Sequence, residues 1–413
     1  MKERKWPTSC PDFKKLGTNE EFIIRLKGNS NIEKEFLDYA LKFKNSAHIL
    51  TEYVLDKGDI SKLDIYFFSL AYLYRHSLEL VLKAIGFKYI CESKERESFI
   101  KDTFHNLSSI LIAIKPFVSI SIERNKSAYT WLEAFFKDMN DMDKESDSFR
   151  YPFGITVKRE NIFEPKQFAI KPFFNKQTHI DLISFVNKME IAFDILENCY
   201  SDSLNISEDY KDYNPVFLEE GGNYYQQSVL GYSYNRYKFH PYVTAYTDSA
   251  KYFYKCISDN KDLKNSLFIP MCYLYRNGLE LALKEIIFEE CSHNLQEALE
   301  ILNKRKHSIL RLWKEIEAPV VKHANPPEHD TTLSDVQKYI DIIHKFDGSS
   351  DKFRYPVDKY LNLHFKNGLK LDIQNVSNFF EELSTFLRSV CMMMSAHNDA
   401  LADMEAENRR WID

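Results

Sequence analysis

The stretch Tyr72–Ile85, YLYRHSLELVLKAI, occurs a second time as Tyr273–Ile286, YLYRNGLELALKEI. Ten of the fourteen positions are identical, and the two copies lie 201 residues apart. Self-similarity of this kind is the sequence signature of an internal duplication. The chain is therefore predicted to consist of two related halves.

Each copy has the pattern of a buried helix with one charged row. It contains no proline, and apolar residues run nearly all the way round the helix. Charged side chains spaced by four residues share one face. The rows are Arg75, Glu79 and Lys83 in the first copy and Arg276, Glu280 and Lys284 in the second. Because buried charges must pair or line a cavity, each row is expected to have partners elsewhere in the chain.

Length and composition favour two helical domains. The chain has 413 residues, 44% of them hydrophobic, with only 11 Gly and 13 Pro. We predict a mainly α protein of two tandem helical bundles about a pseudo-twofold axis, with domains at 1–205 and 236–413 and a linker at 206–235. The helices are expected at 32–56, 63–90, 99–118, 126–141 and 178–199, then at 240–258, 267–290, 295–305, 309–316, 334–346 and 376–394.

Charge and cysteine usage limit the class of protein. The formal net charge of -6 does not favour a purely electrostatic grip on nucleic acid, although a local basic groove is compatible with it. The seven cysteines form no C-x-x-C pair, which is typical of reduced, mostly buried thiols in a cytoplasmic protein. The start MKERKWP is charged and no apolar run reaches membrane-spanning length, so we expect neither a signal peptide nor a membrane partner.

Two further motifs recur with the charged row. SDSFRYP at 146–152 matches SDKFRYP at 350–356, and a small β-hairpin is expected after each. A histidine also recurs, as His105 and His307. The candidate ligand-binding residues are therefore Arg75, Glu79, Lys83, His105, Arg150 and Tyr151 in the first half, and Arg276, Glu280, Lys284, His307, Arg354 and Tyr355 in the second. We find no phosphate-binding glycine loop and no metal-ligand spacing, so no cofactor or metal is expected.

These residue types fit a nucleotide or RNA ligand. Arginine offers a planar fork for phosphate, histidine titrates near neutral pH, and tyrosine can stack on a base. The alternative is structural, because Arg-Glu-Lys rows often only stabilise a helix and FRYP can simply anchor a corner. We predict that Arg75, Glu79 and His105 converge, and that Arg150 reaches the same pocket. The second half should repeat this arrangement.

At these residues the sequence resembles the HEPN domain of prokaryotes and higher eukaryotes. The matching motifs are Glu79–Ala84, His105–Leu107 and Arg150–Pro152, then Glu280–Lys284, His307 and Arg354–Pro356 in the second half. The resemblance implies a helical bundle that tends to pair, including as a homodimer. It also implies nucleotide binding, RNA binding or RNA cleavage, and a role with a partner protein in bacterial antiviral defence or a toxin system.

The ribonuclease branch of that superfamily carries Arg, four to six residues, then His. Here Arg236 and His240 are separated by only three residues, and no histidine follows Arg150 or Arg354 at the expected distance. The sequence therefore favours binding over cleavage. An RNA-cleaving effector and a scaffold with purely structural polar rows remain the alternatives.

Overall fold

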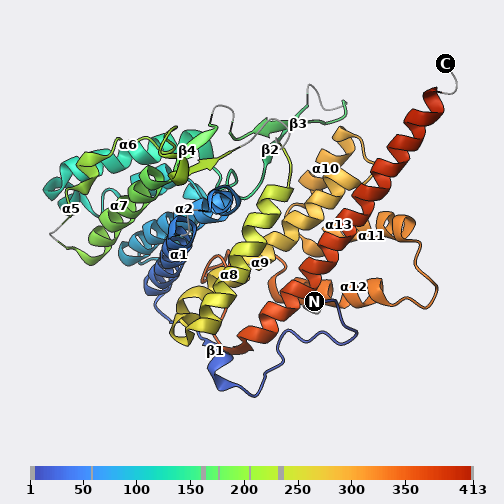
Figure 1. Ribbon diagram of the computed structural model, residues 1–413. Coiled ribbons are helices and arrows are strands. Elements are labelled where there is room, and N and C mark those ends of the chain that lie inside the picture. Colours follow the sequence, from blue (N-terminus) through green and yellow to red (C-terminus); the bar gives the residue numbers. More distant parts are fainter. Residues whose placement is uncertain are drawn as a thin grey trace.

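In the computed structural model the chain is mainly helical, with short antiparallel strand pairs beside the helices (Figure 1). The structure describes residues 5–56, 59–159, 164–174, 177–203, 206–230 and 237–410. The helices of the first half are α1 (Ile32–Asp56), α2 (Ile60–Tyr89), α3 (Ser93–Thr103), α4 (Leu107–Ile114), α5 (Ser119–Arg124), α6 (Lys126–Asp143) and α7 (Leu182–Ser201). Those of the second are α8 (His240–Asp259), α9 (Lys264–Glu285), α10 (Leu295–Arg305), α11 (Ile309–Ala324), α12 (Thr332–Asp347) and α13 (Ile373–Arg410).

Four helices form the centre of the molecule. α1 packs on both α2 and α9, and α8 packs on both α9 and α2. The ring of Tyr72 from α2 stacks on that of Tyr273 from α9, with centroids 4.8 Å apart. Tyr53 of α1 stacks on Tyr252 of α8 at 3.9 Å. The buried apolar side chains of both halves belong to one connected core.

Among the described residues, three strand pairs accompany the helices. β1 (Ile23–Leu26) pairs with β6 (Leu369–Asp372), and β4 (His179–Asp181) pairs with β5 (Gln227–Val229). β1 and β5 precede the first helix of a half, whereas β6 and β4 precede the last helix of the other half. The third pair, β2 (Phe153–Lys158) with β3 (Gln167–Pro172), is the hairpin expected after FRYP in the first half.

The hairpin predicted at 359–372 is wrong. Within 357–368, only the isolated bridge between Val357 and Leu363 is paired. The carboxylate of Asp358 accepts hydrogen bonds from the backbone N–H groups of Tyr360 and Asn362, which folds the chain into a turn instead of a strand. The strand that follows, β6, pairs with β1 from the start of the chain.

Short 3-10 and π-helices complete the described chain, and a break at Phe104 divides one expected helix. The short helices are η1 (Glu20–Phe22), η2 (Asp209–Asp212), η3 (Tyr224–Gln226), η4 (Lys261–Leu263) and the π-helix η5 (Ile286–Glu290). The single helix expected at 99–118 is α3 and α4, separated at Phe104, whose φ is 45°. That sign of φ cannot continue a right-handed helix.

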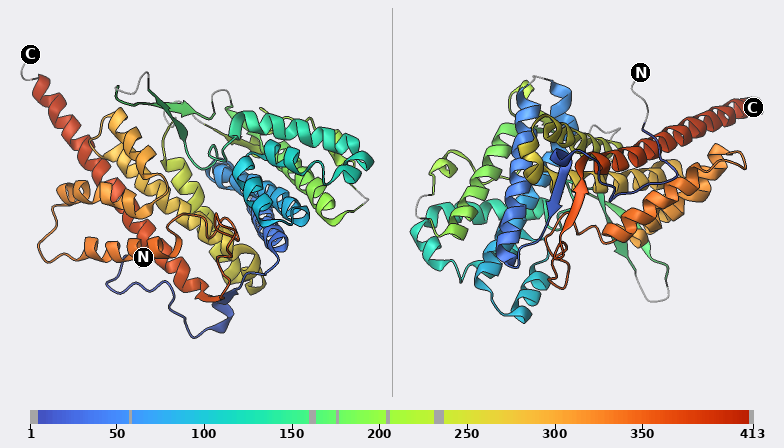
Figure 2. Two further views of the ribbon diagram at one scale, coloured as in Figure 1. Left: turned by 180° about the vertical axis from the view of Figure 1, so that it is seen from behind. Right: turned by 90° about the horizontal axis from the view of Figure 1, so that it is seen from below.

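The first and last described segments of the chain are arranged differently. Residues 5–18 cross to the second half, where the ring of Phe13 lies 4.7 Å from that of Phe346 and the N–H of Gly17 donates to Asp372 at 2.9 Å. The end of α13 projects away from the other helices, and its residues 401–410 are exposed (Figure 2). Among the described residues, no helix has the length and apolar character needed to cross a membrane.

Gly86 provides a test of the packing between α2 and α3. A Cβ atom at this position would lie 2.4 Å from Cζ of Phe99. We expect Gly86→Ala to lower the free energy of unfolding by about 1–3 kcal/mol, measured by urea denaturation, even though alanine is the better helix former.

The double variant Gly86→Ala/Phe99→Leu separates this clash from other causes. Leucine removes the ring atoms that the new methyl group meets, so the two substitutions should be less destabilising together than the sum of their separate effects. Strict additivity would show that the Phe99 ring is not the obstacle.

Candidate functional site

The charged row of α2 is a buried ion cluster. Glu79 is fully buried and lies between its two helical neighbours, with Arg75 Nη1 2.6 Å from Oε2 and Lys83 Nζ 2.7 Å from Oε1. Arg75 Nε also donates to Asp143 at 2.9 Å, from the end of α6. The guanidinium of Arg75 additionally donates to the carbonyl oxygen of His105. The row is therefore paired on all sides, as its burial requires.

His105 enters this cluster from the break between α3 and α4. Its Nδ1 lies 3.0 Å from Glu79 Oε1. The preceding residue, Phe104, has the positive φ of 45°, and its counterpart Lys306 before His307 has a φ of 49°. Residues other than glycine rarely have a positive φ, so the residue before each histidine has a strained backbone. Strained backbone of this kind is found preferentially at functional sites. The predicted convergence of Arg75, Glu79 and His105 is confirmed.

Tyr355, from the second half, completes the first-half cluster. Its hydroxyl donates to Glu79 Oε1 at 2.6 Å and lies 3.0 Å from Nδ1 of His105. Tyr151 of the first half correspondingly donates to Glu280 of the second at 2.7 Å. The prediction that Arg150 reaches the first-half pocket is wrong, because the FRYP corner of each half serves the cluster of the other.

The second cluster repeats this arrangement around Glu280. Arg276 Nη1 lies 3.0 Å from Oε2 of Glu280, and Lys284 Nζ lies 2.8 Å from Oε1. His307 Nδ1 is 2.9 Å from Oε1. One contact differs, because Arg276 Nε is 3.9 Å from Asp347 and makes no hydrogen bond there. The two clusters are therefore alike in composition but not identical in geometry.

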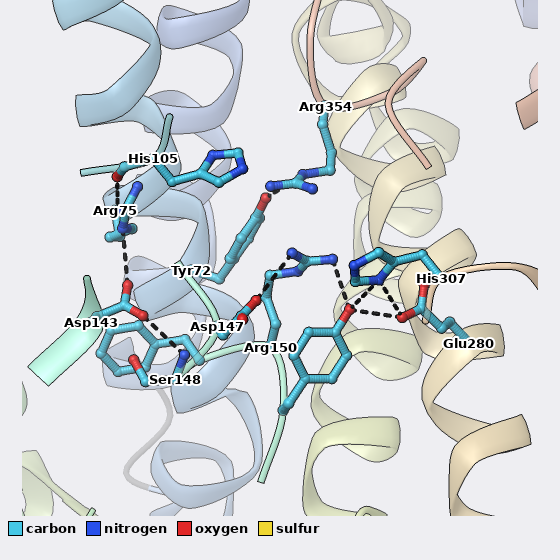
Figure 3. Close-up of polar contacts among 12 residues, drawn as sticks. Tyr72, Arg75, His105, Asp143, Asp147, Ser148, Arg150, Glu280, His307 and Arg354 are labelled. Atoms are coloured by element: carbon cyan, nitrogen blue, oxygen red, sulfur yellow. Dashed lines mark hydrogen bonds and ion pairs between the residues drawn. The ribbon is translucent and has the colours of Figure 1, made fainter. Parts of the chain in front are cut away.

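The two corner arginines lie between the clusters (Figure 3). Arg354 Nε donates to the hydroxyl of Tyr72 at 3.1 Å, and no carboxylate of a described residue lies within ion-pair distance of its guanidinium. Arg150 Nη2 donates to Tyr151 at 2.8 Å, and its Nη1 faces the partly exposed Asp147 at 3.6 Å. Arg150 Nε is buried without a hydrogen-bond partner among the described residues. Both guanidinium groups therefore keep unused donors, and both side chains are buried, with Arg150 3% and Arg354 5% exposed.

The two clusters differ in their balance of charge, and the first carries an excess of positive charge. With its corner arginine, the first contains three cations, Arg75, Lys83 and Arg354, and two carboxylates, Glu79 and Asp143. The second contains Arg276, Lys284 and Arg150 with Glu280, Asp347 and the partly exposed Asp147 that faces Arg150, so its formal charges balance. Buried charge of one sign favours an anionic ligand beside it.

The electrostatics of the first cluster fix its protonation at neutral pH. Burial alone raises the pKa of Glu79, but Lys83, His105 and Arg75 together hold it well below its ordinary value. Burial lowers the pKa of His105 more than the charge of Glu79 raises it. Burial raises the pKa of Tyr355 well above its ordinary value, so its hydroxyl stays protonated and donates. The cluster therefore holds a carboxylate, a neutral imidazole and a phenol.

The second histidine has the same balance. The charge of Glu280 raises the pKa of His307, but burial, Lys284 and Arg150 together leave it below its ordinary value. In each ring Nδ1 faces a carboxylate oxygen, so we assign the proton to Nδ1. The unprotonated nitrogen is then Nε2. The side chains of His105 and His307 are 31% and 41% exposed, which makes them the accessible edge of each buried cluster.

His76, which the sequence pairs with Asn277, gives a prediction on pH dependence. Burial holds the pKa of His76 well below its ordinary 6.5, with Arg354 also opposing its charge. The unfolded chain then binds this proton more readily than the folded one, so stability is lost as the pH falls below about 6.5.

In His76→Asn the free energy of unfolding should decrease less steeply as the pH falls, by up to about 1.4 kcal/mol per pH unit. Urea unfolding at three pH values between 7 and 5 measures it. Equal slopes in the two proteins would show that His76 does not carry the effect.

The candidate residues fall into two groups. The two clusters contain the charged rows of α2 and α9, the two histidines and the two FRYP tyrosines. The two FRYP arginines, Arg150 and Arg354, lie between the clusters. Arg236 lies outside the described residues. Sequence reasoning missed Asp143, Asp347 and Tyr72, although the two aspartates stand at matching distances before FRYP and the tyrosine lies within the duplicated stretch. In the described part of the chain, no His, Cys, Asp and Glu side chains gather in a group that could hold a metal ion.

Comparison with known proteins gives no match to a family model, to a curated protein or to a solved structure. The HEPN resemblance therefore stays a prediction based on the short motifs.

Proposed function

We propose that this protein binds phosphate groups of RNA or of a nucleotide at the interface between its two halves. The observation that carries the proposal is the pair of corner arginines, Arg150 and Arg354. They lie between the two ion clusters, of which the first carries an excess of positive charge, and they keep unused guanidinium donors. The planar guanidinium fork of arginine is suited to donating to two oxygens of one phosphate.

The proposal includes two tandem copies related by a pseudo-twofold axis. It is supported by the reciprocal contacts: Tyr355 reaches Glu79 while Tyr151 reaches Glu280, and the stacked pair Tyr72 and Tyr273 lies between the copies. A two-fold arrangement gives two equivalent edges on which successive phosphates of one strand could lie.

The residues beside the histidines extend each edge. Phe104 is 62% exposed and directly precedes His105, so its ring is available to stack on a base. The matching residue before His307 is Lys306, which is exposed and offers a charge to a phosphate. We therefore place a base near the first edge and backbone phosphate near the second.

The test compares the wild type with Arg150→Lys/Arg354→Lys. Fluorescence anisotropy with labelled tRNA and with labelled single nucleotides distinguishes RNA from a nucleotide as the ligand. We expect the double variant to bind at least about tenfold more weakly, because lysine cannot form the two parallel hydrogen bonds of arginine. Exposed Lys255, substituted by alanine, is the control.

Two further results bear on this proposal. Phe104→Ala, an exposed change that should not disturb folding, should weaken binding of single-stranded RNA by about tenfold. Wild-type protein that binds neither RNA nor nucleotide would refute the proposal. A double variant that melts earlier but binds with unchanged affinity would assign the arginines a structural role.

RNA cleavage is a second candidate, favoured by the orientation of the histidines. Glu79 holds Nδ1 of His105 and leaves Nε2 at the exposed edge, which is the arrangement of a general base. Incubating end-labelled RNA with the wild type and with His105→Ala/His307→Ala tests this. Cleavage by both proteins, or by neither, would exclude these histidines as the catalytic bases. The proposed antiviral defence or toxin system with a protein partner rests on the HEPN resemblance alone, and the cytoplasmic location rests on the cysteine pattern.

A further inference from the structure

A second concave site lies on the second half. It is a cavity of about 490 Å³ between the N-terminal segment, the end of α12 and the turn at 363–369. Cavities of this size hold small ligands in many proteins. None of its lining residues belongs to the two ion clusters.

Four lysines surround this cavity: Lys14, Lys345, Lys352 and Lys366. None of them forms an ion pair or donates a side-chain hydrogen bond to a described residue, and Lys352 instead lies over the ring of Phe346 at 4.4 Å. Among the described residues of the lining, the single carboxylate is Asp12. In a chain of net charge -6, four lysines without carboxylate partners around one cavity form a strong local concentration of positive charge.

The rest of the cavity is apolar and aromatic, with one buried nitrogen lacking a partner. The side chains of Phe13, Phe346 and Phe365 line it together with aliphatic residues. His364 also lines it, and its Nε2 is buried without a hydrogen-bond partner among the described residues. A buried polar atom of this kind usually has a ligand or a water as its partner.

We propose that this cavity binds a small organic polyphosphate with a flat ring, of the nucleoside polyphosphate class. The lysines would neutralise the phosphate chain, the phenylalanines would contact the ring, and His364 would supply the buried hydrogen bond. This site is separate from the interface between the halves and does not depend on the function proposed there.

The cavity is placed to influence the second ion cluster. Lys352 and Arg354 belong to the same corner, and the N–H groups of Asp351 and Lys352 both donate to Asp347. Asp347 is the carboxylate that stands 3.9 Å from Arg276, where the first cluster has a bond of 2.9 Å. A ligand that drew Lys352 toward its phosphates would act directly on this corner.

The experiment titrates the full chain with ATP, inorganic triphosphate and adenosine by isothermal titration calorimetry. We expect saturable binding of ATP, about tenfold weaker binding of triphosphate and no measurable binding of adenosine, because stacking adds to the charge interaction but cannot replace it. Lys345→Glu/Lys366→Glu, at two exposed positions, should weaken ATP binding by about a hundredfold or more.

The control is Lys255→Glu/Lys359→Glu, which makes the same change in net charge at exposed lysines outside the cavity lining. It should bind ATP as the wild type does. In Arg150→Lys/Arg354→Lys the ATP-binding event that Lys345→Glu/Lys366→Glu weakens should remain, which separates this site from any nucleotide bound at the interface. Absence of ATP binding in the wild type, or equal affinity in the two lysine pairs, would overturn the proposal. Equal affinity for ATP and triphosphate would show that the ring of the ligand does not contribute to binding.

Discussion

Glu79→Gln should lower the free energy of unfolding by about 3–5 kcal/mol, the usual effect of removing one partner from a buried ion pair. Oε1 of Glu79 accepts from Lys83, His105 and Tyr355, and Oε2 accepts from Arg75. Glutamine keeps the shape of the side chain but replaces one of these acceptor oxygens by an NH₂ donor. Arg75 and Lys83 then stay buried without the negative charge of the Glu79 carboxylate. Urea denaturation of the two proteins measures the difference.

Two companion variants identify the cause. Glu79→Gln/Lys83→Met also removes the cation, so it should recover part of the lost stability. Glu52→Gln on the exposed side of α1 should change stability by no more than about 0.5 kcal/mol. A loss for Glu79→Gln as small as that of Glu52→Gln would show that the cluster contributes little to the fold.

The duplicated stretch predicted much of the fold because buried helices leave a strong local pattern. α1 and α10 occupy the residues expected of them, and α2 and α9 are the central helices. The buried charged row needed partners, and the recurring histidine was the next recurring polar residue along the sequence. The convergence of Arg75, Glu79 and His105 could therefore be predicted. These inferences need only periodicity and the cost of a buried charge.

The exchange of the corners between halves could not be predicted in this way. Two similar copies offer Tyr151 and Tyr355 to either cluster, and the local sequence is the same for both choices. The path of the chain after α6 and α12 and the packing of α1 and α8 across the centre decide between them. Such long-range geometry leaves no periodic signal. The lysine cavity also escaped prediction, because its residues come from three separated segments.

The first half alone, residues 1–205, should not fold as a stable monomer. Without the second half, Glu79 loses the hydroxyl of Tyr355, and β1 loses its partner strand β6. The faces of α1 and α2 that pack on α9 and α8 would also be exposed to water. An exposed apolar face and an incompletely paired buried charge each destabilise a chain of this size. We expect no cooperative thermal transition by circular dichroism.

Co-expression with residues 206–413 should restore a complex that purifies as one species and unfolds cooperatively, because all of the exchanged contacts can form between two chains. Self-association of residues 1–205 is the other route to stability, since Tyr151 of one copy could occupy the place of Tyr355 beside Glu79 of another. Tyr151→Phe should weaken that self-association. A cooperative transition in the monomeric first half would show that each half is an independent domain and that the exchanged corners are not needed for its fold.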